Sequence, residues 1–390
     1  MHFRPFENPI YVTRPMLPDL ESIYQGLNEV WDSKTLTNGG PKHQKLEKEI
    51  SNYLKVPYNC LFNNGTIALI TACQALRLTG EVITTPFTFP ATPHVLAWNN
   101  IQPVFCDIDP KTMNIDHRKI ESLITNKTSA ILGVHVYGTP CEVDEIEEIA
   151  NRHGLRVIYD AAHAFGLEIN GRGIGTYGDI SMFSFHATKL FHTVEGGCLT
   201  FNDPYLKPRI DLLKNFGIKN ENEVILPGIN GKLNEVQASI GLTNLTLIED
   251  ERKKRAAIIQ TYQEELFDVE GISYLKTQQH VRPSLQYFII RINKDKFGIS
   301  RDELHAKLKE YNVVTRKYFY PLCSDYTCYN SLPSSSPANL VIANQVVHEV
   351  LALPLYGDLE LEDVKTICKM IKSLSPNKNT IVKELVEAAS

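Results

Sequence analysis

Short apolar runs alternate with longer amphipathic stretches through the first half of the chain, and no other feature of the sequence limits the possible folds as much. The apolar runs predict strands at Glu81–Thr85, Pro103–Cys106, Ala130–Val136, Arg156–Tyr159, Asp179–Phe183 and Gly197–Phe201. Apolar residues at the spacing of one buried helix face lie before or between them, at Thr66–Arg77, Phe89–Asn99 and Val143–Arg152. The alternation indicates an α/β fold with a mostly parallel mixed sheet, in which ligands bind at the carboxyl ends of strands.

The length of 390 residues exceeds what a single compact core usually spans, so we expect two domains. A long helical pattern from Leu233 to about Leu266 leaves the sheet region, and shorter elements follow from Gly271. We predict a large domain over residues 1–250, which includes an N-terminal arm, and a smaller C-terminal α/β domain over residues 251–390. The tail at Ser375–Ser390 fits either a docked helix or a frayed end.

Charge and composition exclude several classes of function. A formal net charge of -5 provides no basic surface for nucleic acid. No run approaches the ~18 apolar residues of a membrane span, and the N-terminus has prolines and charges where a signal peptide needs an apolar stretch. We therefore expect a cytoplasmic protein without nucleic-acid or membrane partners. The 8 cysteines form no C-x-x-C pair, so we expect neither a metal site nor disulfides.

One lysine, Lys189, lies between a predicted strand and a glycine-terminated turn, in the segment MFSFHATKLFHTVEGG at Met182–Gly197. Upstream, LRVIYDAAHAFG carries an apolar run into Asp160 and then into a turn of small residues. A lysine amine can bind an aldehyde cofactor covalently, and a carboxylate beside a pyridine nitrogen keeps that nitrogen protonated. The pair predicts a site for pyridoxal 5'-phosphate, with Lys189 as the catalytic residue and Asp160 at the ring nitrogen.

The phosphate of such a cofactor needs backbone amides and hydroxyls at the start of a helix. Gly65 and Thr66 open a helical pattern directly after two asparagines, so their amides and the Thr66 hydroxyl can bind an anion at the positive end of the helix dipole. Ser184 adds a hydroxyl from the strand that leads to Lys189. The alternative is that these residues only cap a helix and bind no ligand.

Segments in one order along the chain resemble the DegT/DnrJ/EryC1/StrS sugar aminotransferases, from about Leu36 to about Tyr356. They are LTNGGP, NNGTIAL, ITTPFTFPAT, PVFCDIDP, VHVYGTP, DAAHAFG, SFHATK, GINGKLNEVQA and LPLY. The resemblance implies a fold-type I, pyridoxal-phosphate-dependent nucleotide-sugar transaminase. It also implies a homodimer with shared active sites.

The resemblance assigns further residues to the cofactor. Phe89 is expected to stack on the ring and His163 to contact the ring hydroxyl. The alternative is that each side chain is packed in the core and contacts no ligand. Asn230 is expected to reach the cofactor phosphate of the other subunit. Lys232, a candidate contact to the nucleotide diphosphate of the substrate, stands where many members of the family carry arginine, and it provides a mobile point charge in place of a planar fork. The alternative for this segment is a solvated turn before a helix.

The resemblance also implies the substrates. L-glutamate is the expected amino donor, and Lys189 is expected to move protons in both half-reactions. The segment VVTRKYFYPL at Val313–Leu322 resembles transaminases that convert dTDP-4-keto-6-deoxy-D-glucose to dTDP-4-amino-4,6-dideoxy-D-glucose, a sugar of surface polysaccharides such as the O-antigen. Arg316, Tyr318 and Tyr320 are candidate contacts to the nucleotide sugar, or parts of a packed strand.

Other functions stay open at this point. The keto sugar can instead be aminated at C3, be aminated at C4 with galactose configuration, carry UDP, or be the GDP-linked precursor of perosamine. Two alternatives belong to other classes, a sugar dehydratase that uses pyridoxal phosphate and a regulator that binds the cofactor without turnover. Relatives that are dehydratases carry histidine at the lysine position, so Lys189 favours transamination.

Overall fold

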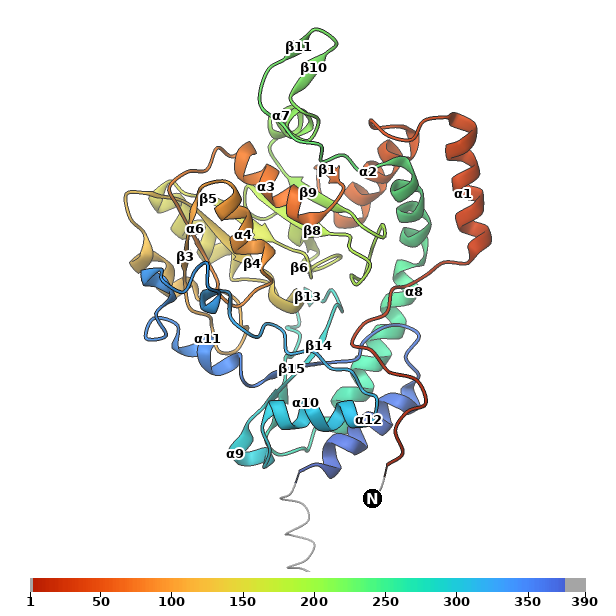
Figure 1. Cartoon of the computed structure of the whole chain (residues 1–390), viewed down its shortest axis with the longest axis vertical. Helices are drawn as coiled ribbons and strands as arrows, with labels where there is room; N and C mark the ends of the chain where they lie inside the picture. The colour runs from red at the N-terminus through yellow and green to blue at the C-terminus, as the bar shows by residue number, and fades with distance from the viewer. Residues whose placement is uncertain (1–2, 376–390) are drawn as a thin grey trace, which may run out of the picture.

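A seven-stranded sheet forms the centre of the computed structural model, which describes residues 3–375 (Figure 1). The strand order is β1-β9-β8-β5-β4-β2-β3; β9 is antiparallel to both of its neighbours, and the other pairs are parallel. The bounds are β1 (Tyr58–Phe62), β2 (Glu81–Thr84), β3 (Gln102–Phe105), β4 (Thr128–Val134), β5 (Arg156–Asp160), β8 (Ile180–Ser184) and β9 (Gly197–Phe201). The predicted α/β fold is confirmed, and the edge strand β1 is an addition to the predicted strands.

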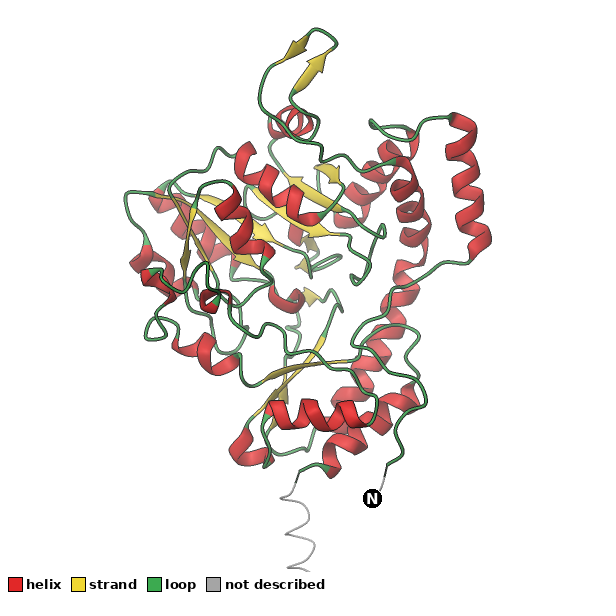
Figure 2. Ribbon diagram, in the orientation of Figure 1, coloured by secondary structure: helices red, strands yellow, loops and turns green. Residues whose placement is uncertain are grey.

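Helices cover both faces of this sheet (Figure 2). Successive residues of a strand point to opposite faces, and each face has its own buried apolar cluster. Ile158 and Met182 belong to the cluster that includes residues of α3 (Gly65–Ala75), α4 (Ala91–Trp98) and α7 (Leu206–Leu213). Their neighbours Val157 and Phe183 belong to the other cluster, with α2 (Pro41–Leu54) and α6 (Val143–His153). Because both faces are buried, the strands read as continuous apolar runs.

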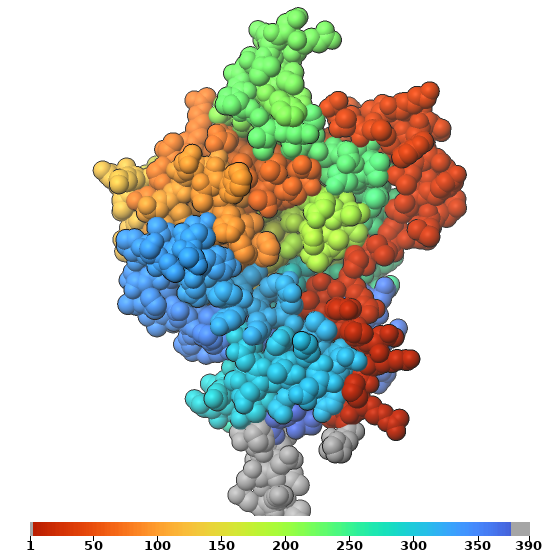
Figure 3. Space-filling model, viewed as in Figure 1, coloured from red at the N-terminus to blue at the C-terminus, as the bar shows by residue number. Residues whose placement is uncertain are grey.

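A second, three-stranded sheet has the order β12-β14-β15 and is antiparallel throughout. A third apolar cluster joins it to α10 and α12, and Ile10 from the N-terminal stretch belongs to the same cluster. That stretch is also held by backbone bonds, because the Ile10 amide donates to the Asn312 carbonyl at 2.8 Å. Figure 3 shows the N-terminal residues lying against this part of the molecule. The bounds are β12 (Ile272–Tyr274), β14 (Phe288–Ile292), β15 (Val350–Leu353), α9 (Lys294–Phe297), α10 (Arg301–Glu310), α11 (Val341–Val346) and α12 (Leu361–Ser373).

The helix α8 (Glu235–Leu266) links the two sheets (Figure 1). It begins where the Asn234 side chain accepts the Gln237 amide at 2.9 Å. Ala238 and Ile248 pack in the cluster with α2, whereas Ile258 and Leu266 pack in the cluster of the second sheet. The helix α1 (Leu20–Ser33) lies beside its first half.

A hairpin of β10 (Ile218–Asn220) and β11 (Glu223–Val224) projects from the body of the molecule (Figures 2 and 3). A small sheet has the order β13-β6-β7. The remaining elements are β6 (Glu168–Ile169), β7 (Arg172–Gly173), β13 (Val281–Arg282), α5 (His117–Ile120) and the 3-10 turns Glu121–Leu123, Val136–Gly138, Ile174–Thr176, Cys323–Asp325 and Pro333–Ser335.

Among the residues from 3 to 375, no helix combines the length and the apolar character that a membrane crossing requires. The expectation for the C-terminal tail concerns residues 376–390, which lie outside the described part of the chain.

Candidate active site

Lys189 lies in the loop between β8 and β9, and the loop is held by a distant glutamine. The buried Gln286 accepts the Leu190 amide at 2.7 Å through Oε1 and donates to the Thr188 carbonyl at 3.0 Å through Nε2. Next to the lysine, Phe191 is buried against Phe165 at a ring separation of 4.6 Å. The backbone on both sides of Lys189 is therefore fixed. Gln286 gave no signal in the sequence, because its partners are 96 and 98 residues away along the chain.

Asp160 ends β5, next to β8 in the sheet, and both of its oxygens are occupied. Oδ2 accepts the Thr92 hydroxyl at 2.8 Å, and Oδ1 accepts the Ala162 amide at 3.0 Å. Burial raises the pKa of Asp160, and these two hydrogen bonds and the charge of Lys189 oppose the increase. The carboxylate is thus held in one orientation inside the protein. Thr92 is a second residue that sequence reasoning missed.

The amine of Lys189 has the properties of a nucleophile. Burial lowers its pKa to about 8, although the negative charge of Asp160 acts in the opposite direction. A substantial fraction of the side chain is therefore neutral near physiological pH. Lys189 and Asp160 influence each other electrostatically.

His163 is buried between aromatic rings. It stacks on Phe319 with ring centroids 5.8 Å apart, and Tyr287 meets it edge-on at 5.1 Å. Burial and the charge of Lys189 lower its pKa well below the ordinary value, so the imidazole is neutral. Its Nδ1 is buried and has no hydrogen-bond partner in the described chain. A buried nitrogen without a partner is costly, and a polar group of a ligand would satisfy it.

The start of α3 lies against the end of β8. A Cβ atom on Gly65 would come within 3.3 Å of Ser184 Cβ, and one on Gly197 would come within 2.7 Å of the Gly65 nitrogen. Asn64 caps the helix by accepting the Ile67 amide at 2.8 Å. Asn64 is therefore the N-cap residue of α3, and the exposed Thr66 hydroxyl is not needed to cap the helix. The structure brings Gly65 and Ser184 together, and Thr66 is the next residue of α3.

The segment Asn230–Lys232 lies near the same helix start, and its middle residue, Gly231, is buried. Asn63 donates its amide to the Gly231 carbonyl at 2.9 Å, and Asn230 pairs with Asn215 in an isolated bridge. Lys232 Nζ donates to Asn215 Oδ1 at 2.5 Å. Asn230 itself is exposed.

The three residues predicted from VVTRKYFYPL line one cavity with Phe89. Its volume is about 360 Å³, and Arg316, Tyr318, Tyr320, His305 and Thr88 are among its walls. Phe89 is 56% exposed and Tyr320 is 46% exposed, so neither is a core residue. The Arg316 guanidinium lies 5.1 Å from the Tyr318 ring centroid. A larger cavity of about 600 Å³, between Pro110 and Tyr274, is lined by none of the predicted site residues.

The residues present fit pyridoxal phosphate. A lysine with a lowered pKa can bind the aldehyde, and a fixed buried carboxylate matches the ring nitrogen. The unpartnered His163 Nδ1 and the start of α3 offer further polar contacts. The fold and this set of residues define a fold-type I aminotransferase that depends on pyridoxal phosphate.

Comparison with known proteins supports the same class of enzyme. The model of the DegT/DnrJ/EryC1/StrS aminotransferase family matches residues 19–372. The chain is 48% identical over 368 residues to the dTDP-4-amino-4,6-dideoxy-D-glucose transaminase of Escherichia coli, covering 94% of this chain and 98% of that one. It is 45% identical to the enzyme of the same name from Shigella dysenteriae, covering 94% and 100%. The solved structure of DesI in the presence of its TDP-sugar product superposes with a TM-score of 0.92 at 34% identity, covering 98% and 97%.

The chain belongs to the DegT/DnrJ/EryC1/StrS aminotransferase family. It is a pyridoxal-phosphate-dependent nucleotide-sugar transaminase, and the predicted family, enzyme class and cofactor are confirmed.

Proposed function

We propose that this enzyme transfers the amino group of L-glutamate to dTDP-4-keto-6-deoxy-D-glucose and produces dTDP-4-amino-4,6-dideoxy-D-glucose. The observation that carries the proposal is the 48% identity, over 94% of this chain, to an Escherichia coli transaminase named for that product. The likeness to DesI, which was solved with a TDP-sugar product, supports the same class of nucleotide. We also propose that the reaction takes place in the cytoplasm and serves surface polysaccharides such as the O-antigen.

Lys189 is the proposed catalytic residue. The bound cofactor supplies an aldehyde that carries the amino group and a ring that accepts electrons. We propose that Lys189 Nζ removes the proton from the α carbon of the donor in the first half-reaction and delivers a proton to C4 of the sugar in the second. Its pKa of about 8 supports both directions, because the amine can be protonated and deprotonated near neutral pH.

The other cofactor contacts are assigned by their chemistry. Asp160 holds the ring nitrogen, and a protonated ring nitrogen would in turn favour its ionised form. His163 Nδ1 would bond the ring hydroxyl, and Phe89 would stack on the ring. The amides of Gly65 and Thr66, with the Thr66 and Ser184 hydroxyls, bind the phosphate at the positive end of α3.

The proposed nucleotide-sugar contacts are Arg316, Tyr318, Tyr320 and Lys232. Support comes from the cavity of about 360 Å³ that the first three share with Phe89. Arg316 has no carboxylate partner among residues 3–375, so its charge is available for a diphosphate. The Lys232 amine bonds the Asn215 side-chain oxygen and has no carboxylate partner among the described residues.

A homodimer with shared active sites completes the proposal, with Asn230 reaching the cofactor phosphate of the partner subunit. Exposed apolar side chains on and beside the projecting hairpin support an interface there. They are Phe216, Ile218, Val224, Ile225 and Ile229. We also propose the division into residues 1–250 and 251–390, supported by the separate apolar cluster of the second sheet.

The test is to incubate the enzyme with pyridoxal phosphate, L-glutamate and dTDP-4-keto-6-deoxy-D-glucose and to measure the mass of the nucleotide sugar. We expect the ketone to become an amine, and NMR then gives the configuration at C4. An unchanged sugar, in a sample where glutamate still converts the cofactor, would reject the substrate. UDP- and GDP-linked keto sugars would be tried next. Loss of water from the sugar would indicate a dehydratase, and no reaction of the cofactor with glutamate would indicate a regulator.

A further inference from the structure

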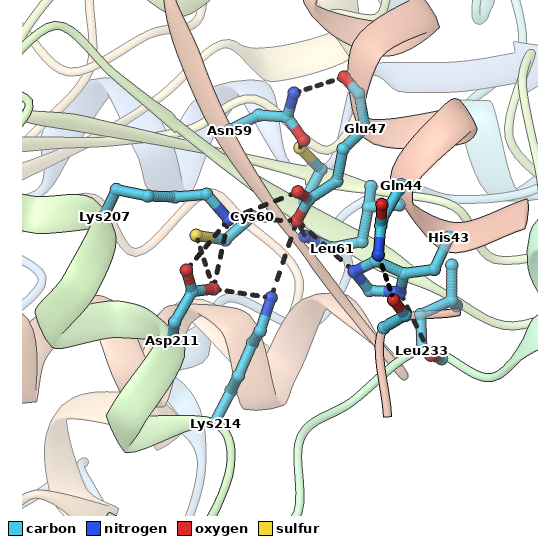
Figure 4. Close-up of polar contacts among 12 residues, drawn as sticks. His43, Gln44, Glu47, Asn59, Cys60, Leu61, Lys207, Asp211, Lys214 and Leu233 are labelled. Atoms are coloured by element: carbon cyan, nitrogen blue, oxygen red, sulfur yellow. Dashed lines mark hydrogen bonds and ion pairs between the residues drawn. The ribbon is translucent and has the colours of Figure 1, made fainter. Parts of the chain in front are cut away.

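A set of charged side chains joins α7 to α2 beneath the edge strand β1 (Figure 4). Glu47 of α2 contacts Lys207 of α7 and Lys214, the residue after α7, with distances of 3.2 Å to Lys207 Nζ and 3.5 Å to Lys214 Nζ. Asp211 contacts the same two amines at 3.0 and 2.9 Å. The Lys214 side chain is only 8% exposed. Each charge has two partners of opposite sign, and a buried charge that lost them would be strongly destabilising.

The positive and negative charges of this set balance one another without a metal ion. Glu47, Asp211 and the Cys60 thiol offer ligand atoms within 4.8 Å of one another. However, two carboxylates already face two ammonium groups, so a cation would add uncompensated positive charge. Burial raises the pKa of Cys60 to about 12, which keeps it a thiol rather than a metal-binding thiolate. We therefore treat these charges as a connection between helices.

The turn that carries Lys214 holds the residues on both sides of Asn230. The Lys214 carbonyl accepts the Gly231 amide at 2.9 Å, and the Leu213 carbonyl accepts the Ile229 amide at 2.8 Å. Asn230 itself pairs with Asn215, the residue after Lys214. Any displacement of the end of α7 therefore moves Asn230 directly.

Glu47 is also connected, through His43, to Leu233 at the other end of the segment that contains Asn230. His43 Nε2 lies 3.3 Å from the Glu47 carboxylate, and His43 Nδ1 lies 3.2 Å from the Leu233 carbonyl. Between these two supports the backbone is closely packed, because a Cβ atom on Gly231 would come within 3.1 Å of the Phe62 ring. Ile229–Leu233 is thus fixed at two points, and both are connected to Glu47.

We propose that Lys214, with Glu47 and Asp211, positions Asn230 for its contact in the active site of the partner subunit. The inference rests on the proposed function, in which Asn230 reaches the partner's cofactor phosphate. Lys214 acts through Asn230 and is a positioning residue. Its removal impairs the cofactor site of the opposite subunit, whereas the site of its own subunit is unaffected.

Hybrid dimers test this directly. Two differently tagged subunits are co-expressed, one with Lys189→Ala and the other with Lys214→Met, and the hybrid is purified through both tags. Its one site with Lys189 receives Asn230 from the subunit in which Lys214 is intact. The affinity for pyridoxal phosphate is measured from the absorbance of cofactor bound to Lys189.

We expect the Lys214→Met homodimer to bind the cofactor about tenfold more weakly, the scale seen when an outer partner of a binding residue is removed. In the hybrid we expect the wild-type affinity. Lys253→Met, an exposed lysine of α8, is the matched control and should bind normally as a homodimer. Weak binding in the hybrid would overturn the proposal, because the damage would then lie within the same subunit. Normal binding by the Lys214→Met homodimer would also overturn it.

A parallel hybrid of Lys189→Ala with Asn230→Ala separates the two hypotheses. If this hybrid is not restored, Asn230 does not act across the interface, and the shared site is rejected together with the positioning role. If it is restored and the Lys214→Met hybrid is not, only the positioning role fails. Should Lys214→Met not fold, Asp211→Asn replaces it, because Asp211 is 40% exposed and its loss removes one partner of the same amine.

Discussion

The hydroxyl of Thr92 donates a 2.8 Å hydrogen bond to Oδ2 of Asp160, so the helix α4 fixes the carboxylate that ends β5. Thr92 is itself buried and lies 2.8 Å from the Thr88 hydroxyl. The carboxylate therefore keeps its orientation before any cofactor arrives, which lowers the cost of binding.

Thr92→Val removes this hydrogen bond and preserves the shape of the side chain. A hydrogen bond to a charged group contributes about 1.5–3 kcal/mol, so we expect kcat/KM to fall by about tenfold or more. Steady-state kinetics with both substrates measure the effect. Thr246→Val, on the exposed face of α8, is the control and should retain wild-type kinetics. Unchanged kinetics in Thr92→Val would show that Thr92 is not needed to orient the Asp160 carboxylate.

Cofactor binding should depend on the protonation of Lys189. Only the neutral amine attacks an aldehyde, and burial lowers its pKa to about 8. The rate at which cofactor-free enzyme captures pyridoxal phosphate should therefore rise with pH through about 8 and then level off. Stopped-flow absorbance measures the rate between about pH 6.5 and about pH 10, where an ordinary lysine would still be rising at the upper end. A rate that keeps increasing throughout would contradict the prediction.

Asp160→Asn should move that inflection to lower pH. The negative charge of Asp160 stabilises the ammonium form of Lys189, so its removal favours the neutral amine. Turnover should nevertheless be lost, because an amide cannot keep the ring nitrogen protonated. Capture rates and turnover are measured on the same preparation. An inflection that moved upward would show that the two groups do not interact as described.

Glu47 should contribute a pH-dependent part of the stability. Burial alone would raise its pKa, but the His43 hydrogen bond and the charges of Lys214 and Lys207 outweigh burial and lower it to about 2. The difference from 4.5 corresponds to about 3 kcal/mol of unfolding free energy at neutral pH. Because the folded pKa is the lower one, this stability is present above 4.5 and is lost as the pH falls toward 2.

Denaturant unfolding of wild type and Glu47→Gln checks this. The difference in unfolding free energy between them should be largest near neutral pH and should shrink in acid. Glu29→Gln removes a carboxylate that is 70% exposed and paired with Lys42, and it should leave the stability near wild type. A difference at Glu47 that does not change with pH would indicate that the charge itself is unimportant.

Gln286→Met tests the support of the Lys189 loop. The substitution leaves the Leu190 amide buried without its acceptor, which costs about 1–3 kcal/mol of stability. We expect a lower melting temperature and a lower kcat, because the backbone loses this support on both sides of Lys189. Gln260→Met, an exposed residue of α8, serves as control. Full activity in Gln286→Met would mean that the loop holds its shape without this residue.

The central fold could be predicted because its signals are local. The strands around Ile158 and Met182 are buried on both faces, so each reads as an apolar run that no distant residue is needed to explain. The strand β1 was missed because it is short, contains Asn59, and pairs with residues more than 130 positions later in the chain. Its strand character comes from that pairing.

The residues of the candidate site also divide into those with a local sequence signal and those without one. Asp160 ends β5 and Lys189 lies in the loop after β8, and the chemistry of each could be inferred from its own segment. Gln286 and Thr92 could not be inferred, since they act on residues 96 and 68 positions away. The ion pair of Glu47 with Lys207 spans 160 positions and gave no pattern in the sequence. The role of Phe89 stays a prediction, and its 56% exposure is compatible with a ligand-facing ring.

The continuous helix α8 restricts how this enzyme can be recombined with its relatives. A chimaera joined near Asp250 would cut a 32-residue helix whose two halves pack in different apolar clusters. A junction after Leu266 keeps the helix whole, but the incoming fragment must then match Ile258, Tyr262 and the N-terminal Ile10. Exchanging the segment around Arg316 for another sugar specificity thus requires coordinated changes at three separate places in the gene.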